Sequence, residues 1–179
     1  ICGSGLIEVI AAMSLAGIIT PDGVVNRALA EHTQRITANG RTFSYALHRA
    51  GDPEASDVLV TQTDVRQIQL AKAALYAGIK LLMDEMGVTT VDRIRLAGAF
   101  GSHISVSHAM VLGLIPDCDL EQVTSAGNAA GAGARMALLD RAARVEIAAT
   151  IAKAERIETA VADDFQAHFV GAMGLPHQS

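Results

Sequence analysis

The 179-residue sequence contains few aromatic residues and few cysteines. Tryptophan is absent and aromatic side chains make up only 3% of the chain, which argues against an aromatic-lined binding groove. Cys2 and Cys118 are too few for a disulfide framework or a metal site, so a reducing, cytoplasmic location is expected.

The sequence also lacks an excess of positive charge and long apolar runs. The formal net charge is -5, the isoelectric point is near 5.6 and no basic stripe is present, so we expect no nucleic-acid partner. No apolar run reaches the roughly 18 residues needed to span a bilayer, and no signal peptide is recognisable. We therefore expect no association with a membrane.

Several catalytic patterns are missing as well. Neither G-x-G-x-x-G nor a Walker Gly-Lys-Ser/Thr occurs, which argues against a Rossmann dehydrogenase and a P-loop enzyme. His103 and His108 lie five positions apart, not the four that place two imidazoles on one helix face, so no metal site is predicted. A helix N-terminus would lower the pKa of Cys2, but no base lies near it in the sequence. We assign no catalytic residue.

The residues that are present predict an α/β fold, with a mixed sheet flanked by helices. Half of the residues are hydrophobic, and strand-like stretches alternate with helix-like ones. In the central segment, residues 93–101, Ile94 and Leu96 alternate with arginines as in a strand. Small residues after a buried strand let the backbone approach a flat or phosphorylated ligand, although many such turns are only strand ends. The turn that follows this strand consists of Gly98, Ala99, Phe100 and Gly101.

Two further small-residue segments are candidate binding elements. Residues 127–133 follow a predicted strand over 120–126 and open a helix. Gly131 and Gly133 each cost a helix about 1 kcal/mol relative to alanine, so we expect close packing against another backbone or a ligand. Ser4 lies in a Gly-Ser-Gly turn before an apolar helix, either as its N-cap or as part of an anion site.

The rest of the pattern predicts one hairpin, one long helix and several shorter elements. Asn39-Gly40 indicates a β-hairpin in an insertion over about residues 33–49, which is either a partner-docking edge or a solvated insertion. The helix is expected over residues 63–86 with Thr63 as N-cap, and Lys72 beside its apolar stripe either reaches an anion or snorkels to solvent. The shorter elements are strands at 57–61 and 156–159 and helices at 106–113, 141–154 and 162–173.

Several motifs together resemble a known family. The order of a long helix, a strand ending Leu-Ala-Gly-Ala-Phe-Gly and a strand followed by Gly-Asn-Ala-Ala-Gly-Ala-Gly resembles the C-terminal half of an actin-like (ASKHA) ATPase. More closely, the sequence resembles the reductive activators of corrinoid proteins of the RACo and RamA type, over nearly the whole chain except residues 26–51. The motifs that carry this closer likeness are Ile-Cys-Gly-Ser-Gly-Leu-Ile at 1–7, the stretch 61–74, Leu-Ala-Gly-Ala-Phe-Gly at 96–101 and Asp-Phe-Gln-x-x-Phe at 164–169.

The resemblance implies an ATP-dependent enzyme that returns an inactive Co(II) corrinoid to Co(I) for methyl transfer, with a corrinoid protein as its partner. It implies ATP and Mg²⁺ as cofactors, and an iron–sulfur cluster in an N-terminal ferredoxin-like domain whose cysteines this sequence lacks. The family places Asp-Ile-Gly-Thr phosphate loops upstream. We therefore expect residues 1–179 to be the C-terminal half of the ATPase domain, continued upstream and inactive alone. By position, the adenosine cleft would be bordered by Gly98, Ala99, Phe100, Gly101, Gly127, Asn128 and Gly131, with Ser4 near the phosphates.

Two other functions stay open at the level of the sequence. The chain could be a non-catalytic module that docks a corrinoid protein or a second copy of itself, and its binding would then be insensitive to nucleotide. It could also belong to a small-molecule kinase of the same superfamily, although no acceptor site is recognisable in these residues.

Overall fold

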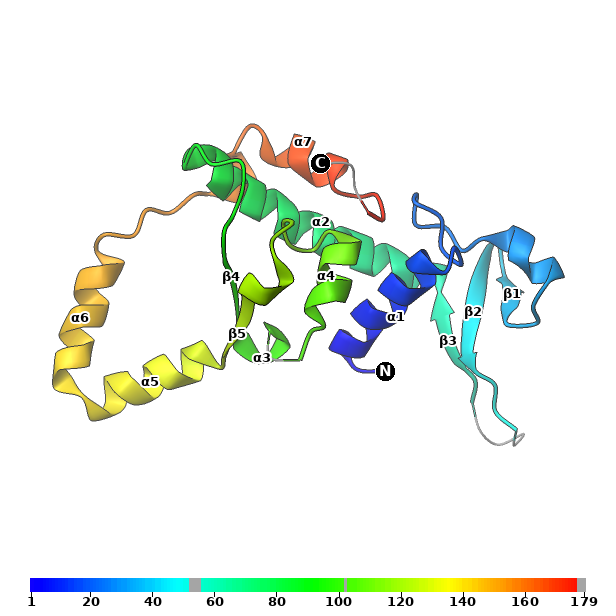
Figure 1. Cartoon of the computed structure of the whole chain (residues 1–179), viewed down its shortest axis with the longest axis horizontal. Helices are drawn as coiled ribbons and strands as arrows, with labels where there is room; N and C mark the ends of the chain where they lie inside the picture. Colours follow the sequence, from blue (N-terminus) through cyan, green and yellow to red (C-terminus); the bar gives the residue numbers. More distant parts are fainter. Residues whose placement is uncertain (52–55, 102, 177–179) are drawn as a thin grey trace.

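The computed structural model describes residues 1–51, 56–101 and 103–176, and Figure 1 shows the arrangement of the elements. The expected α/β class is confirmed. The helices are α1 (Gly3–Leu15), α2 (Gln62–Glu85), α3 (Gly98–Gly101), α4 (Val106–Leu112), α5 (Ala129–Leu139), α6 (Arg141–Ile151) and α7 (Phe165–Gly171). The strands are β1 (Ile36–Asn39), β2 (Thr42–His48), β3 (Val58–Thr61), β4 (Ile94–Ala97) and β5 (Val123–Gly127), and the 3-10 segments are η1 (Arg27–Glu31), η2 (Leu120–Gln122) and η3 (Thr159–Val161).

The long helix α2 runs through the middle of the molecule (Figure 1). It spans 24 residues, follows β3 directly and packs against α1 and α7. The main hydrophobic cluster joins α1, β3, α2 and α4, with Ile10, Val60, Val65 and Leu112 all fully buried. Within the described ranges, no helix combines the length and the apolar character needed to cross a bilayer.

The strands form two separate sheets, one antiparallel and one parallel. The order β1–β2–β3 is antiparallel throughout, whereas β4 and β5 pair in parallel. The predicted hairpin is confirmed, with Asn39 opposite Thr42 and Gly40 at φ +60° in the turn. Because β2 also pairs with β3, the hairpin is an integral part of a three-stranded sheet and does not project alone.

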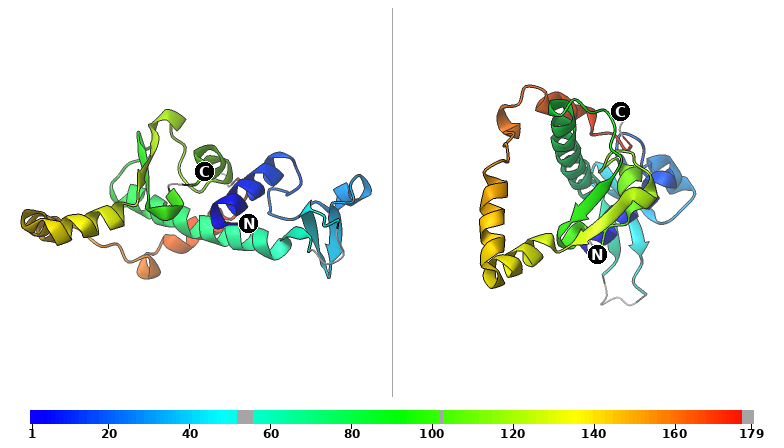
Figure 2. Two further views of the ribbon diagram at one scale, coloured as in Figure 1. Left: turned by 90° about the horizontal axis from the view of Figure 1, so that it is seen from below. Right: turned by 60° about the vertical axis from the view of Figure 1, so that its left-hand side comes forward.

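Helices α5 and α6 extend away from the other elements, as Figure 2 shows from two further directions. The two helices are separate because Asp140 ends one and caps the other, its side chain accepting a hydrogen bond from the Ala142 N–H at 2.8 Å. Apolar side chains on this pair are exposed, including Leu138 at 76% and Leu139 at 80%.

The last part of the chain differs from its predicted structure in two places. The strand expected at 156–159 is wrong: these residues pair with no other strand among those described, and Arg156 instead forms an exposed ion pair with Glu158 at 3.1 Å. Alternating polarity without a neighbouring strand edge does not produce a strand. The helix expected at 162–173 is shorter, since α7 covers only Phe165–Gly171.

The start of α2 also differs from the prediction, because Thr61 and not Thr63 is its N-cap. The Thr61 hydroxyl accepts a hydrogen bond from the Asp64 N–H at 3.2 Å, and the Asp64 carboxylate accepts one from the Thr61 N–H at 2.8 Å. This reciprocal pair is a capping box, which satisfies two backbone donors that the first helical turn leaves without partners.

Replacement of the true cap should therefore destabilise the domain, and replacement of the other threonine should not. We expect Thr61→Ala to lower the free energy of unfolding by about 1 kcal/mol, since it removes the acceptor for the Asp64 N–H. The exposed Thr63→Ala is the matched control and should change stability by less than about 0.5 kcal/mol. Urea denaturation followed by circular dichroism measures both, and equal losses would contradict the assignment.

Candidate functional site

The parallel pairing of β4 and β5 brings the two predicted glycine turns to one edge. Ala97 lies opposite Gly127 in the register, so the carboxyl ends of both strands meet there. Helix α3 begins directly after β4, contacts β5, and lies near the start of α5 in Figure 1. Ligands of open α/β sheets commonly bind outside the carboxyl ends of parallel strands. The edge is therefore the candidate site.

Two glycines at this edge have open space beside them. Gly98 has φ +94° and Gly127 has φ +62°, conformations that side chains rarely adopt. A Cβ built at either position would find no described atom within 4 Å. Both strand ends therefore have room beside the glycine Cα atoms, apart from the atoms of the neighbouring residues in the chain.

The residues after β4 form a single helical turn, α3, where the sequence predicted an open turn. Gly101 closes this helical turn onto its own strand, because a Cβ there would lie 2.8 Å from the Leu96 carbonyl carbon. Ala99 and Phe100 belong to the backbone of α3, but their side chains lie outside the described part of the chain. The packing role of Gly101 is thus internal to the β4–α3 unit.

At the start of α5, Asn128 is the N-cap and its Oδ1 atom accepts a hydrogen bond from the Gly131 N–H at 2.9 Å. A Cβ at Gly131 would lie 2.7 Å from the side-chain amide nitrogen of Asn128, so a larger residue there would displace the capping side chain. At Gly133 the expected packing against another backbone is wrong, because outside its own helix no described atom lies within 4 Å of its Cβ position. That position lies in α5, which extends away from the other elements. The alternative, packing against a ligand, stays a prediction.

Ser4 does not cap α1, because that helix begins at Gly3 with Cys2 in the N-cap position. The Ser4 hydroxyl lies 3.3 Å from the Cys2 sulfur. This side-chain hydrogen bond makes the largest contribution to lowering the pKa of the exposed Cys2 thiol, and a hydrogen bond from the Gly5 backbone lowers it further. No side-chain hydrogen bond among the described residues links Ser4 to the β4–β5 edge.

A largely apolar cavity of about 620 Å³ lies between α2, β4 and α4 and reaches the candidate edge. Ile7 of α1, Ala97 and Gly101 contribute to its lining. Lys72 of α2 also lines it and is only 1% exposed, so the expectation of a snorkelling lysine at the edge of the core is wrong. Burial lowers the pKa of Lys72 to about 8, because a low-dielectric environment disfavours the ammonium form.

The structure offers no protein site for a metal in the part that it describes, where no three His, Cys, Asp or Glu side chains gather. Ser105 occupies the N-cap position of α4, but its side chain makes no capping hydrogen bond, and its hydroxyl lies 2.8 Å from His108 Nδ1.

The sequence did not predict a group of polar side chains that lies near the N-terminal end of α2. Gln62, Arg66 and Gln69 lie four and three residues apart and therefore on one helix face, where all three line a pocket. The spacing of these three residues could have indicated the polar face, but the apolar stripe of the same helix is the stronger pattern in the sequence.

Comparison with known proteins agrees with the fold and extends it. The family model described as the C-terminal domain of RACo, the ASKHA domain, matches residues 1–179. A solved structure, "Reductive activator for corrinoid,iron-sulfur protein", aligns over 100% of this chain and 29% of its own, with a TM-score of 0.89 and 32% identity. The corrinoid activation enzyme RamQ of Eubacterium limosum is 36% identical over an alignment of 148 residues, and the match covers 78% of this chain and 25% of that protein.

The fold is that of an ASKHA domain, the actin-like class of α/β proteins. Within that class the chain belongs to the family of RACo C-terminal domains. It spans less than a third of the length of the relatives that it matches.

The two helical glycines Gly101 and Gly133 should respond in opposite directions to alanine. Gly101→Ala forces a Cβ against the backbone of Leu96 and should destabilise the domain by roughly 1–3 kcal/mol. Gly133→Ala meets open space in a helix interior and should stabilise it by up to about 1 kcal/mol. Urea denaturation of the two variants tests this, and the same sign for both would contradict the packing described here.

Burial of Lys72 predicts a pH dependence of stability. The unfolded pKa is about 10.4, and the folded value is about 8. Between these pH values the unfolded chain binds more protons than the folded chain, so the free energy of unfolding should rise with pH from about 8 to about 10. Below pH 8 Lys72 is protonated in both states and should add no pH dependence. Lys72→Met should remove this rise with pH, because methionine has no group that titrates.

The matched control for this experiment is Lys80→Met, on the same helix. Lys80 is partly exposed and forms an ion pair with Asp84 at 3.3 Å, so its replacement should leave the rise with pH intact. Denaturant unfolding from pH 7 to pH 10 gives both curves. Parallel curves for wild type and Lys72→Met would show that Lys72 is not the group responsible.

Proposed function

We propose that the full-length protein is an ATP-dependent reductive activator, which returns the Co(II) form of a corrinoid protein to Co(I) for methyl transfer. In this proposal the present chain supplies the adenosine side of the nucleotide site. Membership of the RACo family and the names of both relatives, one a corrinoid activation enzyme and one an activator of a corrinoid, iron–sulfur protein, support the reaction class.

The observation that carries the nucleotide assignment is the edge where β4 and β5 end side by side. Gly98 and Gly127 present backbone in positive-φ conformations, with no described atom within 4 Å of the position that a Cβ would take. An adenine ring needs a flat, unobstructed approach of this kind, because a Cβ on either residue would occupy the same space. The residues therefore fit the adenosine part of ATP.

The remaining residues at this edge have supporting tasks. Gly101 lets α3 close tightly onto β4, and so fixes the position of Gly98. The Asn128 carboxamide oxygen is engaged with the Gly131 N–H and so fixes the start of α5 beside the cleft. Ala99 and Phe100, in the backbone of α3, complete the proposed adenosine side.

Bound ATP would supply the free energy of phosphoryl hydrolysis for an uphill reduction. This chain contains no acidic cluster, among its described residues, that would hold Mg²⁺. We propose that the phosphate-binding residues, the Mg²⁺ ligands and the iron–sulfur cluster that donates the electron belong to the rest of the full-length protein. Closure of the two halves around ATP would change docking on the corrinoid protein.

Titration of the full-length protein with ATP and Mg²⁺ by calorimetry tests the nucleotide site. We expect saturable binding by the wild type and a loss of at least about tenfold in affinity for Gly98→Trp, because the indole would fill the space at the end of β4. A reduction assay on Co(II) corrinoid protein would be the next step.

Gly87→Trp is the matched control for backbone strain and bulk. Gly87 has φ +64° and open space at its Cβ, as Gly98 has, but it follows the C-terminal end of α2 and precedes β4. ATP should bind this variant as it binds the wild type. Equal affinity for all three proteins, or no binding by any, would argue against the adenosine site.

A second candidate is a docking or dimerisation module, which the exposed apolar side chains of α5 and α6 favour. Leu138, Leu139 and Ile151 are each exposed by two thirds or more, a degree of apolar exposure typical of surfaces that contact another protein. Calorimetric titration with the corrinoid protein, with and without ATP, separates the two functions, because a docking module would bind its partner equally well in both conditions.

A further inference from the structure

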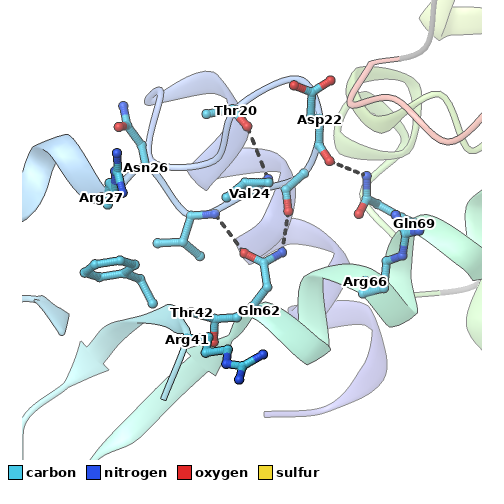
Figure 3. A pocket seen from close by; sticks show the side chains of 13 residues that line it. Thr20, Asp22, Val24, Asn26, Arg27, Arg41, Thr42, Gln62, Arg66 and Gln69 are labelled. Carbon is cyan, nitrogen blue, oxygen red and sulfur yellow. Dashed lines mark hydrogen bonds between the residues drawn. The ribbon is translucent and has the colours of Figure 1, made fainter. Parts of the chain in front are cut away.

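A second cavity, of about 690 Å³, lies at the end of the molecule formed by the three-stranded sheet, away from β4, α3 and β5 (Figure 1). Three segments that are distant in the sequence surround it: the loop of residues 20–27 after α1, residues 41–43 of the hairpin, and the first turns of α2. Figure 3 shows this pocket from close by. It plays no part in the nucleotide site proposed above.

The loop that forms one wall is held in place by two glutamines of α2 (Figure 3). Gln62 accepts a hydrogen bond from the Val25 N–H at 3.0 Å and donates one to the Gly23 carbonyl. Gln69 donates to the Asp22 carbonyl at 3.2 Å and is itself almost fully buried. Because these bonds fix the loop before any ligand arrives, binding would require little reordering of the wall.

Glycine at position 23 is part of the same construction. Its φ of +78° is a conformation that other residues rarely adopt, and a Cβ there would overlap the Gln69 amide. The contacts of Gly23 and Gln69 therefore hold this wall of the pocket in place.

Three arginines line the pocket, one from each segment: Arg27, Arg41 and Arg66. Within the described ranges, none of their guanidinium groups forms a hydrogen bond or an ion pair. Among the described residues of the lining, Asp22 is the only acidic one. The pocket thus concentrates positive charge on a chain whose net charge is -5.

Two other arginines of the same sheet have structural partners and make the contrast clear. Arg35 donates hydrogen bonds to the Ala46 and Leu47 carbonyls, both at 2.9 Å. Arg49 forms an ion pair with Asp57 at 2.6 Å. The hydrogen bond from the Ala50 N–H makes the largest contribution to lowering the pKa of Asp57, and the contact with Arg49 lowers it further. The arginines of the pocket therefore differ from those that hold the sheet together.

The positions of the three arginines indicate what kind of anion would fit. In Figure 3 Arg27, Arg41 and Arg66 lie on different sides of the pocket, each on a different one of its three segments. Guanidinium groups pair with carboxylates through two parallel hydrogen bonds. Several carboxylates along an extended chain match three separated guanidinium groups better than one phosphate does.

We propose that this pocket binds an acidic peptide segment of a partner protein, through salt bridges from Arg27, Arg41 and Arg66. Val24, which is 51% exposed, and Phe43 provide apolar contact beside the charges. Binding is independent of the nucleotide proposal, because the two sites share no residue.

The test uses the full-length protein and a fluorescein-labelled peptide of alternating glutamate and glycine, with fluorescence anisotropy as the readout. We expect the wild type to bind, and each of Arg27→Gln, Arg41→Gln and Arg66→Gln to weaken binding about threefold, as exposed ion pairs do. The triple variant should lose at least about tenfold. Binding should also weaken as salt is raised, because mobile ions screen exposed charges.

Two controls accompany this titration. A peptide with glutamine in place of glutamate should not bind. The triple variant Arg135→Gln, Arg141→Gln and Lys153→Gln removes the same charge from exposed positions around α5 and α6, and should bind the acidic peptide as the wild type does. Circular dichroism of both triple variants should match the wild type, since the pocket arginines form no hydrogen bonds within the described chain.

Three outcomes would overturn the proposal: no binding of the acidic peptide, equal binding by the pocket variant and the wild type, or equal losses in the two triple variants. Binding of inorganic phosphate that is lost in the pocket variant, without peptide binding, would mean a small-anion site and would also overturn it. The peptide should bind Gly98→Trp normally, so a failure of the ATP proposal and a failure of this one are distinguishable.

Discussion

The constraint on which the rest of the structure depends is the direct passage from β3 into α2, with no connecting loop. Thr61 is both the last residue of the strand and the cap of the helix, and Asp64 closes the capping box. The antiparallel sheet and the long helix are therefore joined without a connecting loop. The same helix carries Arg66, which lines one pocket with Arg41 of the hairpin, and Lys72, which lines the other cavity with residues of β4.

Local signals were sufficient where a single short segment determines its own conformation. Asn39-Gly40 predicted the hairpin, and the alternation around Ile94 predicted β4, because turn chemistry and strand periodicity act over neighbouring residues. The cap of α2 could have been read from the spacing of Thr61 and Asp64, but Thr63 offered the same residue type two positions later. The false strand at 156–159 had the right alternation and lacked only a partner, which no local pattern reveals.

The sequence predicts which segments form the candidate site, but not what each glycine in those segments does. The sequence indicates both glycine turns, but only the parallel pairing of β4 with β5 brings them to one edge. That Gly101 packs on its own strand, and that Gly131 makes room for the Asn128 cap, depends on which atoms surround the missing Cβ. The burial of Lys72 has the same origin, because a helix pattern shows a face but not the depth to which other elements cover it.

Exposed apolar side chains lie on α5, the helix that begins at the candidate site. Helix α5 begins at the Asn128 cap, so its direction is set at one end by the edge that carries Gly98 and Gly127. At the other end Leu138 and Leu139 contribute apolar surface whose burial is worth about 25 cal/mol per Å². A surface that covers these leucines would therefore contact the same helix that begins beside the strand ends. The candidate site and the exposed leucines therefore lie at opposite ends of one helix.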